Sequence, residues 1–241
     1  MFGEIKNSHG ERLDYTFHPG DPAARSVVVL GHGVTGNKDR PFIVALANGL
    51  AAAGLPTLRV SWSGNGASGG RFVDSNITKE VADLGAVLDA LAGRTVCYVG
   101  HSMGGAVGVL RASQDPRIRL LVSLAGMVHT RAFAQREFGM VTPGAGSMWD
   151  EPSCPLSQAF MDDLTRLDSV ADRAPFIKVP WLLVHGTEDD VVPIQDTRDI
   201  LKLANEPKEF IELAGCGHVF SGNFTPVMVE KATGWIRARL K

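Results

Sequence analysis

The chain has 241 residues and 44% hydrophobic content, which is enough for one large domain with a sizeable core. A net charge of −2 gives no electrostatic reason to expect nucleic acid or an anionic membrane as partner, and no apolar run approaches the roughly 18 residues that span a bilayer. The first residues lack the pattern of a signal peptide and the three cysteines are widely spaced, so we expect a cytoplasmic protein with reduced thiols.

Short apolar runs alternate with segments of helical spacing along most of the chain. Two runs flanking a turn, 2–7 and 12–17, predict an N-terminal hairpin. Further strands are predicted at 26–30, 56–62, 95–99, 119–124, 180–184 and 208–213. Helices are predicted at 41–53, 78–91, 103–113, 157–171, 194–203 and 226–240. This alternation predicts one α/β domain over residues 1–241, with a mostly parallel, doubly wound sheet of about eight strands.

The alternation is interrupted between residues 126 and 178, where Met, aromatic, Pro and Gly residues gather. We expect a small cap insertion there, lying over the carboxyl edge of the sheet, where open α/β sheets carry their active sites. Its apolar side chains either line a compact substrate pocket or pack the cap onto the sheet. The candidates for substrate contact, one of them beyond the cap, are Met127, Phe133, Met140, Met148, Trp149, Phe160 and Phe220.

One stretch has the pattern of a catalytic nucleophile. The strand predicted at 95–99 ends at Gly100-His101-Ser102-Met103-Gly104, and a small-residue helix follows. A serine on such a strand–turn–helix element is exposed above the sheet and lies at a helix N-terminus, which favours negative charge. The same five-residue pattern occurs around Ser68, but a loop and not a helix follows it. We therefore interpret Ser102 as the nucleophile and Ser68 as part of a flexible loop.

A serine nucleophile needs a base and an acid that orients the base. Among seven histidines, His218 fits best, since it follows the last predicted strand on the short loop Gly215-Cys216-Gly217. The acid is expected on the loop after the preceding strand, where Glu188, Asp189 and Asp190 are adjacent. The residues alone do not distinguish these three.

Four motifs together resemble the α/β-hydrolase superfamily, and in particular its feruloyl/cinnamoyl-esterase-like and serine-aminopeptidase-like members. They are the Gly-His-Ser-Met-Gly run, Gly-Cys-Gly-His, and the segments His-Gly-Val-Thr-Gly-Asn-Lys and His-Gly-Thr-Glu-Asp-Asp-Val-Val-Pro. The resemblance implies Asp189 as the acid and the backbone N–H groups of Val34 and Met103 as the oxyanion hole. The chain departs from the family at 61–66, where relatives often carry Asp-x-Arg-Gly-His-Gly and this sequence reads Ser-Trp-Ser-Gly-Asn-Gly.

The predicted function is hydrolysis of carboxylic esters, with short- to medium-chain or aryl acyl groups, through an acyl-enzyme. An aminopeptidase, amidase or thioesterase would use the same three residues. A binding protein of this fold is less favoured because such proteins usually lose one of the three. Dehalogenases and epoxide hydrolases need an aspartate at position 102. No metal-ligand spacing and no phosphate-binding or dinucleotide motif is found, so we expect a small-molecule ester as partner and no cofactor or metal.

Overall fold

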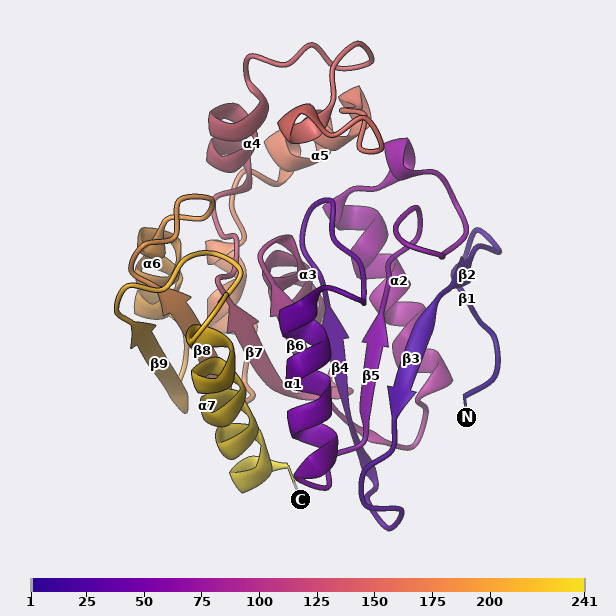
Figure 1. The fold of residues 1–241 in the computed structure, drawn as a ribbon, viewed down its shortest axis with the longest axis vertical. Coiled ribbons are helices and arrows are strands. Elements are labelled where there is room, and N and C mark those ends of the chain that lie inside the picture. Colours follow the sequence, from indigo (N-terminus) through magenta and orange to yellow (C-terminus); the bar gives the residue numbers. More distant parts are fainter. Residues whose placement is uncertain (1, 241) are drawn as a thin grey trace.

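Seven strands form the main sheet of the computed structural model, which describes residues 2–240 (Figure 1). Their order is β3-β5-β4-β6-β7-β8-β9, with β3 antiparallel to β5 and the other neighbours parallel. The strands span Tyr15–His18 (β3), Ser26–Gly31 (β4), Thr57–Val60 (β5), Thr95–His101 (β6), Ile118–Leu124 (β7), Trp181–Gly186 (β8) and Lys208–Leu213 (β9). The mostly parallel, doubly wound sheet predicted from the sequence is confirmed.

The sheet has an apolar core on each face, because successive residues of a strand point to opposite sides. Val27 and Val29 of β4 belong to one core, and Val28 and Leu30 to the other. Helices α2, α3 and α6 pack on the first face, and α1 and α7 on the second (Figure 1). These helices span Pro41–Ala52 (α1), Ile77–Ala90 (α2), Met103–Ala112 (α3), Ile194–Leu203 (α6) and Phe224–Arg239 (α7). Burial on both faces explains why the central strands are continuous apolar runs.

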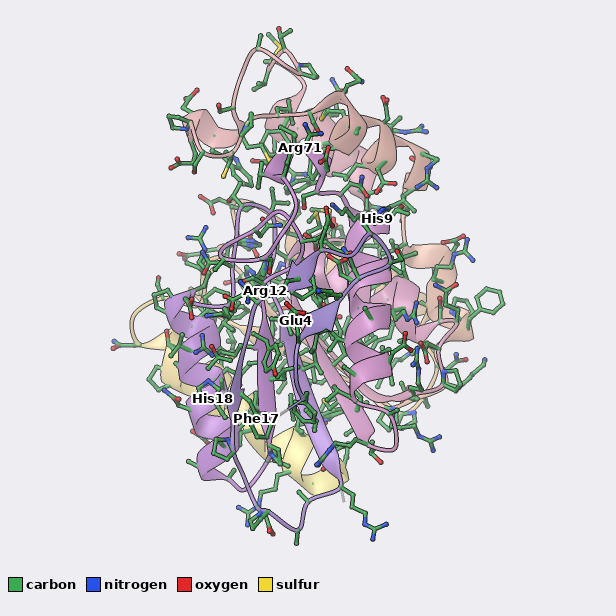
Figure 2. All side chains as sticks on the ribbon, turned by 90° about the vertical axis from the view of Figure 1, so that its right-hand side faces the viewer. Glu4, His9, Arg12, Phe17, His18 and Arg71 are labelled. Carbon is green, nitrogen blue, oxygen red and sulfur yellow. The ribbon has the colours of Figure 1, made fainter. Side chains whose placement is uncertain are left out.

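The N-terminal residues account for the difference between about eight predicted strands and seven observed ones. The hairpin forms a separate two-stranded sheet of β1 (Ile5–Lys6) and β2 (Arg12–Leu13). After it, β3 pairs with β5 and becomes the edge of the main sheet; Figure 2 looks onto this edge, with Phe17 and His18 labelled. The break falls at Asp14, whose N–H donates a hydrogen bond to the Ser68 hydroxyl.

The segment between β7 and β8 lies beyond the carboxyl ends of the strands (Figure 1). Asp163 joins it to the main body by accepting hydrogen bonds from the N–H (3.0 Å) and hydroxyl (2.6 Å) of Thr78, at the start of α2. The helix predicted at 157–171 is present as the shorter α5, and a second helix that was not placed from the sequence, α4, precedes it. The elements of the segment are α4 (Thr130–Phe138), η2 (Met148–Asp150), α5 (Gln158–Leu167) and η3 (Ala171–Phe176).

The cysteines and the lengths of the helices bear on where the protein could reside. Cys97, Cys154 and Cys216 are buried free thiols. Over residues 2–240, none of the helices combines the length and the apolar character that crossing a membrane requires.

Candidate active site

Ser102 lies at a sharp turn between β6 and α3. Its backbone has φ = 55° and ψ = −120°, a conformation that is costly for a residue with a side chain and is concentrated at functional sites. The neighbouring backbones pack tightly, since a Cβ atom on Gly100 would come within 2.0 Å of the Gly104 carbonyl oxygen. The N–H of Ser102 donates to the carbonyl of Leu124 on β7 at 3.0 Å, which anchors the turn to the sheet. The structure thus has the strand–turn–helix geometry predicted around this serine.

His218 and Asp189 lie side by side, although they come from loops after different strands. His218 Nδ1 is 2.8 Å from Asp189 Oδ2, and both side chains are largely shielded from solvent. Asp189 Oδ1 accepts hydrogen bonds from the backbone N–H groups of Val191 (3.0 Å) and Val192 (2.8 Å). Burial by itself raises the pKa of the Asp189 carboxyl, but hydrogen bonds from His185 and His218 lower it overall, well below its usual value. Asp189 is therefore a carboxylate that can hold the imidazole in one orientation.

His185 is a second histidine on the same carboxylate and was not assigned a role from the sequence. Its Nε2 lies 3.1 Å from Asp189 Oδ2 and 2.9 Å from the carbonyl oxygen of Val192, and its Nδ1 lies 2.8 Å from the Thr197 hydroxyl. Because a carbonyl oxygen only accepts, Nε2 carries the hydrogen. His185 thereby fixes the Asp189 side chain. The sequence feature that could have identified His185 is its place at the start of the His-Gly-Thr-Glu-Asp-Asp motif.

His101 connects the nucleophile strand to the loop that carries His218. Its Nε2 is 3.0 Å from the carbonyl oxygen of His218, so it donates a hydrogen bond, and its ring centre is 4.6 Å from that of His218. The other side of the ring packs on Phe42, with centres 4.6 Å apart. Burial lowers the pKa of His101 well below its usual value, which keeps the imidazole neutral.

The turn after β4 orients the predicted oxyanion hole. The Gly33 carbonyl oxygen accepts hydrogen bonds from His32 Nδ1 (2.9 Å) and from the N–H of Gly36 (3.0 Å). In a trans peptide the N–H points away from the C=O, so the Val34 N–H is directed to the opposite side. His32 Nε2 accepts from the Trp62 N–H at 3.0 Å, and burial lowers the pKa of His32 to about 4. A neutral histidine in a single tautomer therefore holds this peptide in place.

The same turn lies directly against Ser102. A Cβ atom on Gly33 would be 2.6 Å from the Ser102 Cβ, so only glycine permits this approach. Met103 is the first residue of α3, where a backbone N–H has no partner within the helix. Within residues 2–240, no hydrogen bond is recorded from the N–H of Val34 or Met103. Both amides are available to an oxygen bound beside Ser102.

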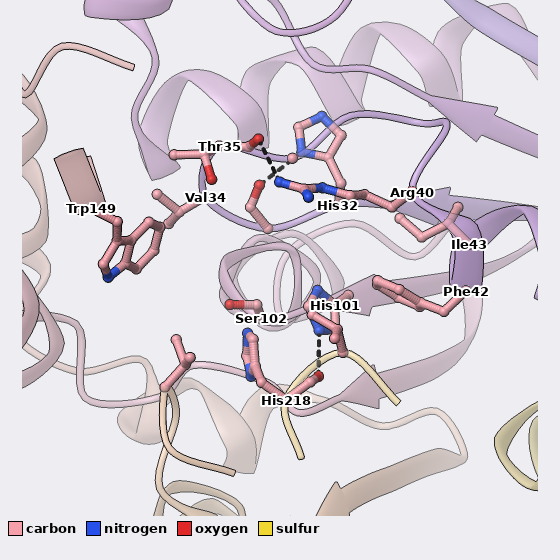
Figure 3. A pocket seen from close by; sticks show the side chains of 14 residues that line it. His32, Val34, Thr35, Arg40, Phe42, Ile43, His101, Ser102, Trp149 and His218 are labelled. Atoms are coloured by element: carbon pink, nitrogen blue, oxygen red, sulfur yellow. Dashed lines mark hydrogen bonds between the residues drawn. The ribbon is translucent and has the colours of Figure 1, made fainter. Parts of the chain in front are cut away.

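Ser102 and His218 face one cavity of about 270 Å³ (Figure 3). In the part of the chain that the structure describes, no hydrogen bond joins the Ser102 hydroxyl to His218; catalytic hydrogen bonds of this kind often tighten only when substrate binds. Most of the lining comes from the turn after β4, the start of α1, and the loops that carry Asp189 and His218. The lining residues besides Ser102 and His218 are His32, Gly33, Val34, Thr35, Gly36, Arg40, Phe42, Ile43, His101, Trp149, Val191 and Val219.

The residues predicted to contact substrate are mostly elsewhere, and of the seven only Trp149 lines the cavity. Met140 is 98% exposed on the cap. Phe220 is buried against Phe42 and His101, which line the cavity, but does not line it itself. The other four, Met127, Phe133, Met148 and Phe160, are buried in the apolar core that joins the cap to the sheet. Of the two alternatives left open by the sequence, the second holds for these four: their side chains pack the cap onto the sheet, and they are not the substrate contacts expected.

Within the described residues, neither a metal centre nor the second serine motif forms part of the site. Across residues 2–240, no group of three or more His, Cys, Asp or Glu side chains is arranged to hold a metal ion. Ser68, the serine of the second motif, donates to the Ser61 carbonyl (2.7 Å) and accepts from the Asp14 N–H, and it does not line the cavity.

The chain resembles known proteins both in sequence and in structure. A family model described as "Alpha/beta hydrolase family" matches residues 27–231. A monoacylglycerol lipase from Mycolicibacterium smegmatis is 25% identical over 267 residues, covering 96% of this chain and 95% of that protein. Est1E from Butyrivibrio proteoclasticus, with ferulic acid bound, superposes with a TM-score of 0.85 at 21% identity over 98% of each chain. A monoacylglycerol lipase from Paleococcus ferrophilus gives a TM-score of 0.75 at 21% identity, over 94% of this chain and 98% of that one. These structures share the fold described above.

Proposed function

The chain belongs to the alpha/beta hydrolase family, and we propose that it is a serine hydrolase that cleaves carboxylic esters through an acyl-enzyme. One observation supports this most strongly. His218 Nδ1 is 2.8 Å from Asp189, and His218 faces the same cavity as Ser102 on its strained turn. A nucleophile, a base and a group that orients the base are what acyl transfer requires.

In this proposal, His218 Nε2 takes the proton of the Ser102 hydroxyl as the oxygen attacks the ester carbonyl. Asp189 holds the Nδ1–H and stabilises the imidazolium that forms. The negative oxygen of the tetrahedral intermediate accepts hydrogen bonds from the Val34 and Met103 amides, each typically contributing about 10²–10³ in kcat. The imidazolium then protonates the leaving alcohol, and water repeats the cycle on the acyl-enzyme to release the acid.

The cavity size favours small substrates. Each buried methylene stabilises binding by about 0.8 kcal/mol until the space is filled, and a cavity of about 270 Å³ is filled early. We expect kcat/KM to rise from acetyl to about butanoyl or hexanoyl esters and then to fall. The name of the Mycolicibacterium smegmatis relative, a monoacylglycerol lipase, agrees with an ester substrate. We also propose a cytoplasmic location, which free thiols favour.

Two measurements test the proposal. A fluorophosphonate probe should label the wild-type protein and not the Ser102→Ala variant. Purified protein should then be assayed on 4-nitrophenyl esters with acyl chains from acetyl to hexadecanoyl, beside a thioester and an aminoacyl-anilide. An optimum at dodecanoyl or longer would indicate a lipase, and efficient anilide or thioester cleavage would indicate the amidase or thioesterase alternative. Labelling that persists in Ser102→Ala would contradict the proposal as a whole.

A further inference from the structure

The cavity beside Ser102 contains one permanent charge, the guanidinium of Arg40. The lining holds no Asp or Glu side chain, and its other polar members are hydroxyl, imidazole and backbone groups. Asp189 lies behind His218, where its oxygens are already bonded to His185, His218 and two backbone N–H groups. A substrate in this cavity therefore meets a positive charge with no negative side chain beside it.

The charge of Arg40 is not neutralised by the acid next to it in sequence. Asp39 is bonded to Lys38 (2.9 Å) and to Arg59 (2.7 Å), and none of these three residues lines the cavity. Within residues 2–240, no carboxylate lies within ion-pair distance of Arg40, whereas most of the other arginines there have one. Its field reaches the site: besides burial, the Arg40 charge contributes to the lowered pKa of His32 and His101.

Arg40 is held in place by a strained turn. Its Nη2 donates to the carbonyl oxygen of Thr35 at 3.0 Å (Figure 3). Thr35 has φ = 55°, which is unfavourable for a β-branched residue and is tolerated where the surrounding structure imposes it. A guanidinium has five N–H donors, so one bond to Thr35 leaves the others available. Figure 3 shows Arg40 and Trp149 on different sides of Ser102, one charged and one aromatic.

We propose that Arg40 binds a carboxylate of the substrate, so that the preferred substrates are esters that carry a second, ionised carboxyl group. The planar guanidinium matches a carboxylate with two parallel hydrogen bonds, a geometry that favours arginine over lysine. This inference rests on the proposed ester hydrolysis and names its substrate class. It also predicts that a neutral ester of equal size is a poorer substrate.

The test uses two pairs of substrates that differ only in charge. The 4-nitrophenyl monoester of adipic acid and the 4-nitrophenyl ester of adipic monoamide differ at the end of the acyl chain, whereas 4-carboxyphenyl and 4-carbamoylphenyl butanoate differ in the alcohol part. We expect the wild-type protein to favour the charged member of at least one pair by about 5- to 50-fold in kcat/KM. Arg40→Gln should bring that ratio to about one, and Arg40→Lys should retain part of it. The ratio is measured within one protein, so a loss of folded protein cancels.

The matched control is Arg71→Gln, which removes the same charge from an exposed arginine that does not line the cavity and is labelled in Figure 2. It should keep the wild-type ratio. The wild-type preference should also weaken with added salt, since Arg40 is exposed to solvent. A ratio of one or less in both pairs, or a preference that Arg40→Gln leaves intact, would overturn the inference while ester hydrolysis stands. Failure to hydrolyse any ester of either pair would instead remove the proposed function.

Discussion

Two segments of this chain share the pattern Gly-x-Ser-x-Gly and use it in opposite ways. At 100–104 the serine begins a helix, has a strained backbone and presents its hydroxyl to a cavity. At 66–70 the serine lies in a loop, and both hydrogen-bonding roles of its hydroxyl are occupied by the backbones of Ser61 and Asp14. The element that follows the motif, and not the motif itself, separates a free hydroxyl from a structural one.

The glycines of the two segments also serve different ends. Position 104 needs glycine because there is no room for a side chain: a Cβ there would lie 2.6 Å from the carbonyl oxygen of His32. Position 70 favours glycine because its backbone has φ = 89°. The atoms nearest to a Cβ there belong to the flexible side chain of Glu11. Close backbone packing thus marks the first segment, and turn geometry marks the second.

The largest difference is expected between the two serines. Ser102→Ala should lower kcat for an ester by about 10⁴–10⁶ and abolish fluorophosphonate labelling, because the nucleophile is removed. Ser68→Ala should keep labelling and turnover near wild type. It should lower the free energy of unfolding by about 1–2 kcal/mol, since Asp14 N–H loses its acceptor. Equal loss of activity in both variants would contradict the distinction drawn here.

A second difference concerns the His–Asp pair, which only Ser102 has beside it. Asp189→Asn should reduce kcat by about 10⁴, because the amide favours the wrong tautomer of His218. Asp190→Asn removes the same charge one residue away, from an exposed side chain, and should stay within a few-fold of wild type. Steady-state kinetics of both variants measure this. Reversed results would place the acid at position 190.

The glycines give a smaller contrast. Gly104→Ala should push on the backbone of His32, costing about 1–3 kcal/mol of stability and lowering kcat about 10²-fold. Gly70→Ala should cost about 1–2 kcal/mol through its positive φ and leave kcat near wild type. Urea unfolding and ester kinetics separate the two effects. If Gly70→Ala lowered kcat as much as Gly104→Ala, the loop at 66–70 would have a part in catalysis.

The smallest expected effect is on stability against pH. Burial lowers the pKa of His32 to about 4 in the folded state, so the unfolded chain binds more protons below about pH 6.5. The contribution of His32 is therefore complete above that pH and is lost as pH falls towards 4, amounting to about 1 kcal/mol between pH 8 and pH 6. His32→Asn should show a smaller decline in unfolding free energy over this interval.

The sequence predicted the strands well because burial on both faces leaves an unbroken apolar run, as in β4 and β6. It also pointed to Ser102 and His218, because each follows a strand end in a short motif, whereas Asp189 came from the resemblance to the α/β-hydrolase superfamily and not from the residues alone. The pocket could not be read in the same way. Met140 and Trp149 belong to the same apolar segment, yet one is 98% exposed and the other lines the cavity. Composition does not say which way a side chain faces.

Contacts between distant segments could not be predicted from the sequence either. The bond from His185 to Asp189 and the contact between the rings of His101 and His218 depend on how loops fold over the sheet edge. Arg40 had no local signal at all, since its importance comes from the lack of an acid around the cavity.

The bond between His101 and the backbone of His218 joins residues 117 positions apart. A ribosome adds residues in order, so the turn that carries Ser102 is synthesised well before the loop that carries His218. Until that loop docks on His101, the growing chain has Ser102 without His218 beside it. In the proposed mechanism, hydrolytic activity therefore begins only when β9 and the loop after it are in place, so turnover would report the late docking of this loop.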